Sequence, residues 1–118
     1  MLQAQHMAHA VRRDIHKMKA NLRMHALRDA SGRDLQVGCY EPAHHVVEAV
    51  APWFGKRIPA ARWAIFTPER SVRCVDGALL YGPGVPSAQL PGPDGSNADW
   101  LACYARVFAP HDRPAEHA

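Results

Sequence analysis

A run of strand patterns between residues 61 and 84 constrains the fold of this chain most strongly. Two apolar runs, residues 72–75 and 78–81, are separated by Asp76-Gly77. Asp-Gly between apolar runs is the strongest short-range signal for a β-hairpin, because both turn residues must accept positive φ. A third run at residues 62–66 stops at Thr67-Pro68, so the segment predicts three strands. The side chains that we expect in its core are Trp63, Phe66, Cys74 and Tyr81. Cys74 is expected there as a small hydrophobic residue and not as a reactive thiol.

An apolar stripe with helical spacing predicts an N-terminal helix. The stripe residues recur every three or four positions, so they share one side only if the segment is α-helical: Met7, Val11, Ile15, Met18 and Leu22. Five polar, mostly cationic positions fall on the opposite arc: His9, Arg12, Arg13, His16 and Lys19. We interpret this arc either as a phosphate-contacting surface or as the solvated side of an amphipathic helix.

Alternating polarity predicts a β-hairpin between residues 22 and 40. Before the turn, one set of side chains points to one side of the strand: Leu22, Met24 and Ala26. The alternate set points to the other side: Arg23, His25 and Leu27. After the turn at residues 30–34, the sets are Leu35, Val37 and Cys39, and Gln36, Gly38 and Tyr40. One face is then apolar, and the other presents Arg23, His25 and Tyr40, groups that can stack on bases and contact phosphate. Leu27 departs from this pattern.

Glu41-Pro42 predicts the start of a second helix, because proline is tolerated in the first helical turn. Pro52 is expected to kink or end this helix, which leaves Trp53 and Ile58 to pack beneath the sheet. The residues of its expected buried stripe are Ala43, Val46, Val47, Val50 and Phe54.

The other side of this helix holds the nearest approach to a catalytic or metal-binding cluster. His44, His45 and Glu48 lie three or four positions apart, so the carboxylate could orient an imidazole. A third ligand at a recognisable spacing is missing, and neither a metal nor any other cofactor is expected. An enzyme would use His16, Glu41, His44 or His45 as acid, base or metal ligand near the Gly-Pro-Gly segment.

The C-terminal third combines a loop with a capped helix. Residues 82–96 are dense in glycine and proline and are predicted to continue neither a helix nor a strand ladder. Ser96 and Asp99 form an S-x-x-D capping box for the last helix. Its expected buried residues are Trp100, Leu101, Tyr104, Val107 and Phe108. Residues 111–118 are predicted to form a disordered tail, because they lack apolar periodicity.

These patterns predict a single α+β domain over residues 1–110. We expect a mainly antiparallel sheet of about five strands with three helices, in the order α-β-β-α-β-β-β-α. The three cysteines form no C-x-x-C pair, which indicates neither a disulfide framework nor a cysteine zinc site. No stretch approaches the roughly 18 apolar residues that span a bilayer, and the N-terminus lacks the features of a signal peptide. We therefore expect a soluble, cytoplasmic protein.

Positive charge is concentrated in the N-terminal part of the chain. The net charge is +3, yet residues 1–70 hold 11 Lys and Arg against 6 Asp and Glu, whereas residues 71–118 hold 3 against 5. Such a surplus attracts polyanions such as nucleic acid, and a surplus of this size is also common on ordinary solubilising surfaces.

Four sequence blocks carry a family resemblance. They read HKM at residues 16–18, EPAHH at 41–45, RWAIFTPE at 62–69 and YGPG at 81–84. Over residues 12–110 the chain resembles a bacterial domain family of unknown function that is labelled as a probable DNA metabolism protein. That domain also occurs fused in front of a uracil-DNA glycosylase domain, and it accompanies a radical-SAM protein of DNA repair. The resemblance implies DNA or such a repair enzyme as partner; because no glycosylase segment is present, it does not imply uracil excision.

The chain departs from this family pattern in two respects. The family shows aromatic, basic-rich sequence after its HKM block, whereas this chain has NLRMH at residues 21–25, which weakens the case for base stacking. The chain also begins close to the HKM block and ends soon after Phe108, which indicates a shortened member or a fragment.

Three functional hypotheses follow. A DNA-associated accessory module would bind nucleic acid or a repair enzyme through a surface formed by Arg12, Arg13, His16, Lys19, Arg23, His25 and Arg62. An enzyme would require His16, Glu41, His44 and His45 to converge on one pocket. A protein-binding scaffold would expose Trp53 or Trp100.

Overall fold

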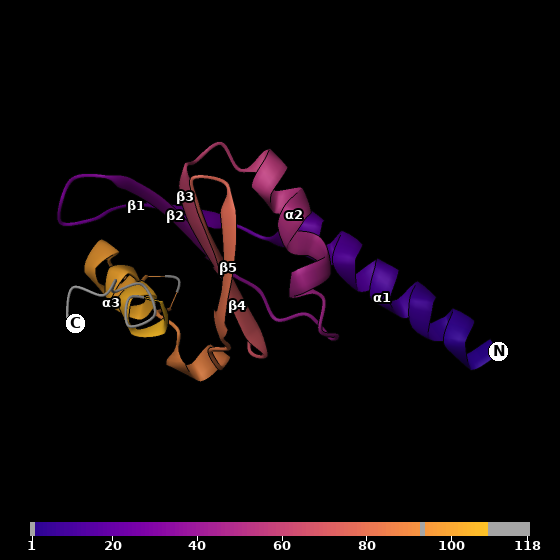
Figure 1. The fold of residues 1–118 in the computed structure, drawn as a ribbon. Helices are drawn as coiled ribbons and strands as arrows, with labels where there is room; N and C mark the ends of the chain where they lie inside the picture. Colours follow the sequence, from indigo (N-terminus) through magenta and orange to yellow (C-terminus); the bar gives the residue numbers. More distant parts are fainter. Residues whose placement is uncertain (1, 93, 109–118) are drawn as a thin grey trace, which may run out of the picture.

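A computed structural model of the chain describes residues 2–92 and 94–108, with the side chains of residues 2–7 excepted (Figure 1). In chain order the elements are α1 (Leu2–Asn21), β1 (Met24–Arg28), β2 (Asp34–Cys39), α2 (Val47–Arg57), β3 (Arg62–Phe66), β4 (Arg70–Val75), β5 (Ala78–Pro83), the short 3-10 helix η1 (Ser87–Gln89) and α3 (Asn97–Val107). This order confirms the predicted α+β fold. The predicted tail at residues 111–118 lies outside the described residues.

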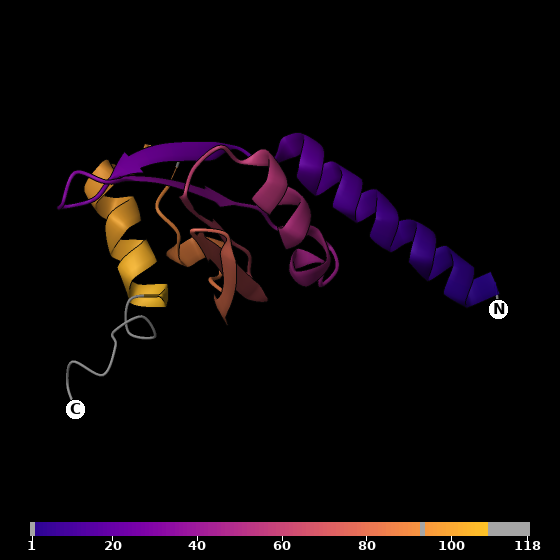
Figure 2. The ribbon, with the colours of Figure 1, turned by 45° about the horizontal axis from the view of Figure 1, so that its top comes forward.

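The five strands form one sheet in the order β1-β2-β3-β4-β5. Strands β2 and β3 are parallel, and the other neighbours are antiparallel. Parallel neighbours need a crossover connection, which α2 supplies. Helices α1 and α2 lie on one side of the sheet and α3 lies on the other (Figures 1 and 2). The carboxyl ends of β2 and β3 therefore share one edge, where the segments after them meet.

Each side of the sheet has its own hydrophobic core. On the α1 and α2 side, the core includes Met18, Val46, Val50, Phe54, Trp63, Ile65 and Val72. On the α3 side, it includes Leu35, Val37, Phe66, Trp100, Val107 and Phe108. Trp63, Phe66 and Cys74 are buried as predicted, and Tyr81 packs half-buried against the first core.

The Asp-Gly hairpin is confirmed. Asp76 and Gly77 have φ of 50° and 88° and join β4 to β5, whose register pairs Val75 with Ala78. Gly84, in the Gly-Pro-Gly segment, meets a different constraint, because a Cβ there would overlap the carbonyl group of Pro68. The close backbone approach at Gly84 therefore serves internal packing of the chain.

The face assignment of the first hairpin is wrong. The register pairs His25 with Val37 and Leu27 with Leu35, so the odd-numbered positions of both strands share one face. Leu27 is thus a core residue on the α3 side, and Tyr40 lies with the opposite core, away from His25. Alternation within each strand was predicted correctly, but the pairing register between strands depends on both cores and cannot be obtained from one strand alone.

The predicted start of the second helix is also wrong. Helix α2 begins at Val47, and residues 41–46 form an irregular segment in which Ala43 is exposed. Pro52 lies inside this helix, which continues to Arg57. Pro52 is the sixth of eleven residues in α2, and it leaves one carbonyl, that of Glu48, without its backbone donor. Trp53 and Ile58 pack against the core as expected.

Residues 82–96 are more regular than predicted. Strand β5 extends to Pro83, because Gly82 and Pro83 still pair with Ser71 and Arg70, and η1 follows at Ser87–Gln89. A proline is compatible with this edge strand, because an N–H that faces the open side of the sheet makes no bond to a neighbouring strand. The capping box of α3 is confirmed, with Ser96 and Asp99 bonded reciprocally.

Candidate functional site

The outward side of α1 is a continuous cationic surface. Its stripe of Val11, Ile15, Met18 and Leu22 packs against the core, which turns the opposite arc to solvent. We call this arc the basic face and define it as His9, Arg12, Arg13, His16, Lys17 and Lys19. Among the described residues, no ion pair joins any of these six to a carboxylate. Figure 2 shows the N-terminal half of α1 extending beyond α2 and the sheet.

Asp14 is the single acidic residue of α1, and it is buried. It is 6% exposed, and its Oδ2 accepts the backbone N–H of His44 at 2.7 Å. The same oxygen lies 3.1 Å from Nδ1 of His44. A buried carboxylate is unfavourable unless hydrogen-bonded, and His44 satisfies this requirement. The single negative charge of α1 is therefore buried and bonded to His44, and it is not exposed among the cations.

The basic face continues onto α2 through Trp53. The ammonium group of Lys19 lies 4.7 Å from the centroid of the Trp53 ring, and the guanidinium of Arg57 lies 4.8 Å from it. Cation–π contacts of this kind hold both cations at defined positions. Trp53 is half-buried beneath them and Trp100 is 3% exposed, so neither ring is the open platform that the scaffold hypothesis requires.

Three further predicted binding residues lie in different places. Arg23 is exposed and lies two residues after the end of α1. His25 stacks on Trp100 on the α3 side of the sheet, with ring centroids 5.3 Å apart. Arg62 is paired with Asp29 at 2.7 Å, and its side chain is 12% exposed. Because His25 and Arg62 are engaged elsewhere, we leave them out of the candidate surface.

Asp29 organises the turn of the first hairpin. Its carboxylate accepts hydrogen bonds from the Ser31 hydroxyl and the Arg33 backbone N–H, in addition to the Arg62 guanidinium. These bonds, that from the Ser31 hydroxyl above all, hold the pKa of Asp29 well below its usual range. Arg62 therefore has a structural role in this turn.

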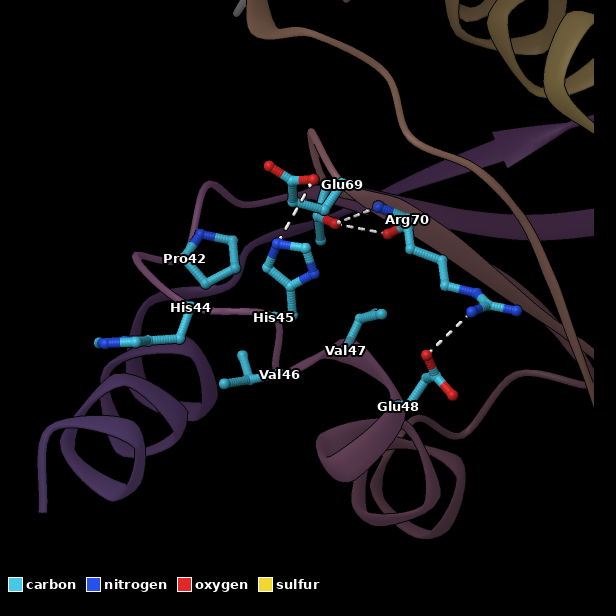
Figure 3. Close-up of a pocket in the computed structure, with 9 residues that line it drawn as sticks. Pro42, His44, His45, Val46, Val47, Glu48, Glu69 and Arg70 are labelled. Carbon is cyan, nitrogen blue, oxygen red and sulfur yellow. Dashed lines mark hydrogen bonds and ion pairs between the residues drawn. The ribbon is translucent and has the colours of Figure 1, made fainter. Parts of the chain in front are cut away.

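A second polar site lies where the segments after β2 and β3 meet (Figure 3). It is a cavity of about 140 Å³ whose lining includes His44, His45, Glu48, Glu69 and Arg70; we call it the paired pocket. His45 Nε2 lies 3.4 Å from Glu69 Oε2, and Arg70 donates to Glu48 at 2.9 Å. Figure 3 shows the rings of His44 and His45 pointing in different directions. Glu48 and Arg70 form an ion pair, and His44, His45 and Glu69 each already have a polar partner.

The four residues of the enzyme hypothesis are not brought together. His16 is exposed on the basic face, about 200° around the helix from Asp14, which holds His44. Glu41 lies outside the paired pocket and accepts a hydrogen bond from the Ser87 hydroxyl at 2.6 Å. The described residues also contain no group of three or more His, Cys, Asp or Glu side chains placed to hold a metal ion.

The surroundings of Cys39 and Cys103 do not activate their thiols. Burial raises the pKa of the Cys39 thiol. Burial likewise raises the pKa of Cys103, partly offset by the positive charge of Arg106. Because the thiolate is the reactive form, neither thiol is favoured as a nucleophile.

Sequence reasoning missed Lys17 of the basic face and three further residues of these sites, Asp14, Glu69 and Arg70. Asp14 falls on the stripe side of its helix, between Val11 and Met18, and an acid at such a position is a signal for a buried partner. Glu69 and Arg70 belong to the turn after β3, and their contacts with His45 and Glu48 are nonlocal. No sequence spacing indicates such contacts.

Comparison with known proteins identifies the family. A model of a domain family of unknown function, DUF4130, matches residues 1–114. The chain belongs to this family. This assignment confirms the resemblance to a domain family of unknown function, although the DUF4130 description names no activity. No curated protein and no solved structure shows significant similarity to the sequence. Within the described part of this DUF4130 domain, no helix has the length and hydrophobicity that a bilayer crossing requires.

Proposed function

We propose that this domain is a DNA-associated accessory module of DNA repair or metabolism, which binds nucleic acid through the basic face of α1. One observation carries the proposal: the exposed cations of the helix have no carboxylate partner among the described residues, while its single acid, Asp14, is buried. A surface of this kind concentrates positive potential, which attracts a polyanion.

The expected strength and salt dependence follow from the charges. Four residues of the basic face carry a full positive charge at neutral pH: Arg12, Arg13, Lys17 and Lys19. If each neutralises one phosphate, the logarithm of the affinity falls with the logarithm of the salt concentration with a slope of about −4. Affinity should then fall roughly a hundredfold between 50 and 200 mM salt.

The family resemblance extends the proposal to a partner. The domain would bring a repair enzyme to DNA, either a radical-SAM protein or a uracil-DNA glycosylase domain. No catalytic role is needed for this function, which agrees with the separation of His16, Glu41 and His44 in space.

A titration of fluorescently labelled DNA with the purified protein tests the proposal. Fluorescence anisotropy should report binding at 50 mM salt that weakens steeply as salt is added. A matched control is the variant Arg28→Gln/Arg33→Gln, which removes two exposed cations from the far end of the first hairpin and should bind like the wild type. Absence of binding to both single- and double-stranded DNA at low salt would exclude the proposal.

A further inference from the structure

The fully charged residues of the basic face form two rows along α1. At 100° per residue, Arg12 and Lys19 lie within about 20° of each other, and Arg13 and Lys17 lie within about 40° of each other. The two pairs are separated by roughly 130° around the helix axis. Between the rows lie His9, His16 and Ala20, all exposed. We refer to Arg12 and Lys19 as the first row and to Arg13 and Lys17 as the second.

Two cationic rows on one helix match the two phosphate backbones that border a DNA groove. An α-helix with its side chains is about 10–12 Å across, and the major groove of B-form DNA is about 12 Å wide. A helix lying in that groove has one phosphate backbone on each side, so each row would meet its own strand. The N-terminal half of α1 extends beyond α2 and the sheet (Figure 2), and both rows lie in residues 12–19, directly after this projecting half.

The surroundings of α1 do not favour single strands. Proteins that bind single-stranded nucleic acid usually stack bases on exposed aromatic rings. Helix α1 contains no Phe, Tyr or Trp, and the nearby Trp53 is half-buried and contacted by Lys19 and Arg57. Double-stranded RNA is disfavoured for a different reason, because the major groove of A-form helices is too deep and narrow for side chains to read.

We infer that α1 lies in the major groove of duplex DNA, with each cationic row on the phosphates of one strand. This inference rests on the proposed function and adds the form of the nucleic acid and the contacts that each row makes. Contacts to phosphates carry no sequence information, so the domain binds duplex DNA with little dependence on sequence.

Anisotropy titrations with three labelled probes at 50 mM salt test this inference. The probes are a 20-base-pair DNA duplex, one of its strands alone, and an RNA duplex of the same length and sequence. The DNA duplex should bind at least about tenfold more tightly than the other two. Two variants, Arg12→Gln/Lys19→Gln and Arg13→Gln/Lys17→Gln, should each lose about two units of salt slope, because each removes one row. Glutamine retains helix propensity, and circular dichroism checks that each variant is folded.

The possible outcomes separate the inference from the proposed function. Equal or tighter binding of the single strand or of the RNA duplex would overturn the groove inference and leave a nucleic-acid-binding domain. A loss of affinity in only one of the two row variants would also overturn the groove inference, because a helix in the groove contacts phosphates through both rows. Failure of all three probes to bind would overturn the proposed function itself. The inference would also be overturned if the control Arg28→Gln/Arg33→Gln lost as much affinity as the row variants.

Discussion

The basic face of α1 and the paired pocket contain similar residues in opposite electrostatic states. In the paired pocket, Arg70 is held by Glu48 and His45 by Glu69. On the basic face, no ion pair joins a cation to a carboxylate within residues 2–92 and 94–108, and the one acid of the helix, Asp14, is buried beneath. Charges that neutralise one another hold segments together, whereas unneutralised charges attract an external partner.

The largest effect is expected from reversing charge on the basic face. Arg12→Glu/Arg13→Glu should weaken DNA binding roughly a hundredfold at 50 mM salt, because two phosphate contacts are replaced by repulsion. Anisotropy titration against labelled duplex measures the change. Both side chains are exposed, so the unfolding midpoint should stay close to that of the wild type. A variant that is folded and still binds like the wild type would show that the basic face is not the DNA-binding surface.

Asp14 connects the two regions, so its removal should affect stability and leave binding intact. Asp14→Ala deletes the acceptor of the His44 backbone N–H and ring, which should lower the free energy of unfolding by about 1–3 kcal/mol. Urea denaturation measures this loss, and Asp14→Asn is the matched control, because it keeps an acceptor and should lose less. DNA affinity of the folded Asp14→Ala protein should be equal to or slightly above that of the wild type. Weaker binding would mean that Asp14 contributes to the interface.

Neutralising the paired pocket should have little effect on either property. Glu48→Gln/Arg70→Gln removes an exposed ion pair, and such pairs contribute about 0–1 kcal/mol. DNA affinity should change less than twofold, because the net charge of the pocket is unaltered. A loss comparable to that of Arg12→Glu/Arg13→Glu would reverse the comparison and place the binding site at the pocket.

The smallest effect is expected at Asp29, whose bonds are local to a turn. Its lowered pKa means that the folded state favours the ionised carboxylate, so its contribution to stability is present above about pH 4 and is lost as pH falls further. The difference in unfolding midpoint between wild type and Asp29→Asn should therefore be largest near neutral pH and shrink below pH 4. Urea denaturation at pH 7 and pH 3 measures this difference. A difference that grows on acidification would contradict the assigned ionisation.

The parts of the fold that were predicted depend on local signals. Asp76-Gly77 specifies its own turn through two positive φ angles, and Ser96 with Asp99 specifies a capping box within four residues. The stripe of α1 likewise shows its buried side directly. These features follow from neighbouring residues alone, which is why the element order could be predicted.

The parts that were missed depend on contacts between distant segments. The register that places Leu27 with Leu35 reflects the core beneath α3, and the late start of α2 at Val47 accompanies the bond from His44 to Asp14, thirty residues away. The basic face was predicted from periodicity, but the burial of Asp14 and the contacts of Lys19 and Arg57 with Trp53 were not. The sequence therefore predicted most of the residues that form the basic face. The structure was needed to show that the charged residues of the paired pocket contact one another and that those of the basic face form no ion pair with a carboxylate of the described residues.

Mapping DNA contacts by NMR tests the central claim most directly. Amide chemical shifts of isotopically labelled protein would be followed as unlabelled DNA duplex is added at 50 mM salt. The account predicts that the largest changes lie in residues 9–23 of α1 and its connection to β1, with smaller changes near Trp53 and Arg57. Changes centred on residues 42–48 and 67–70 around the paired pocket, with α1 unaffected, would contradict it.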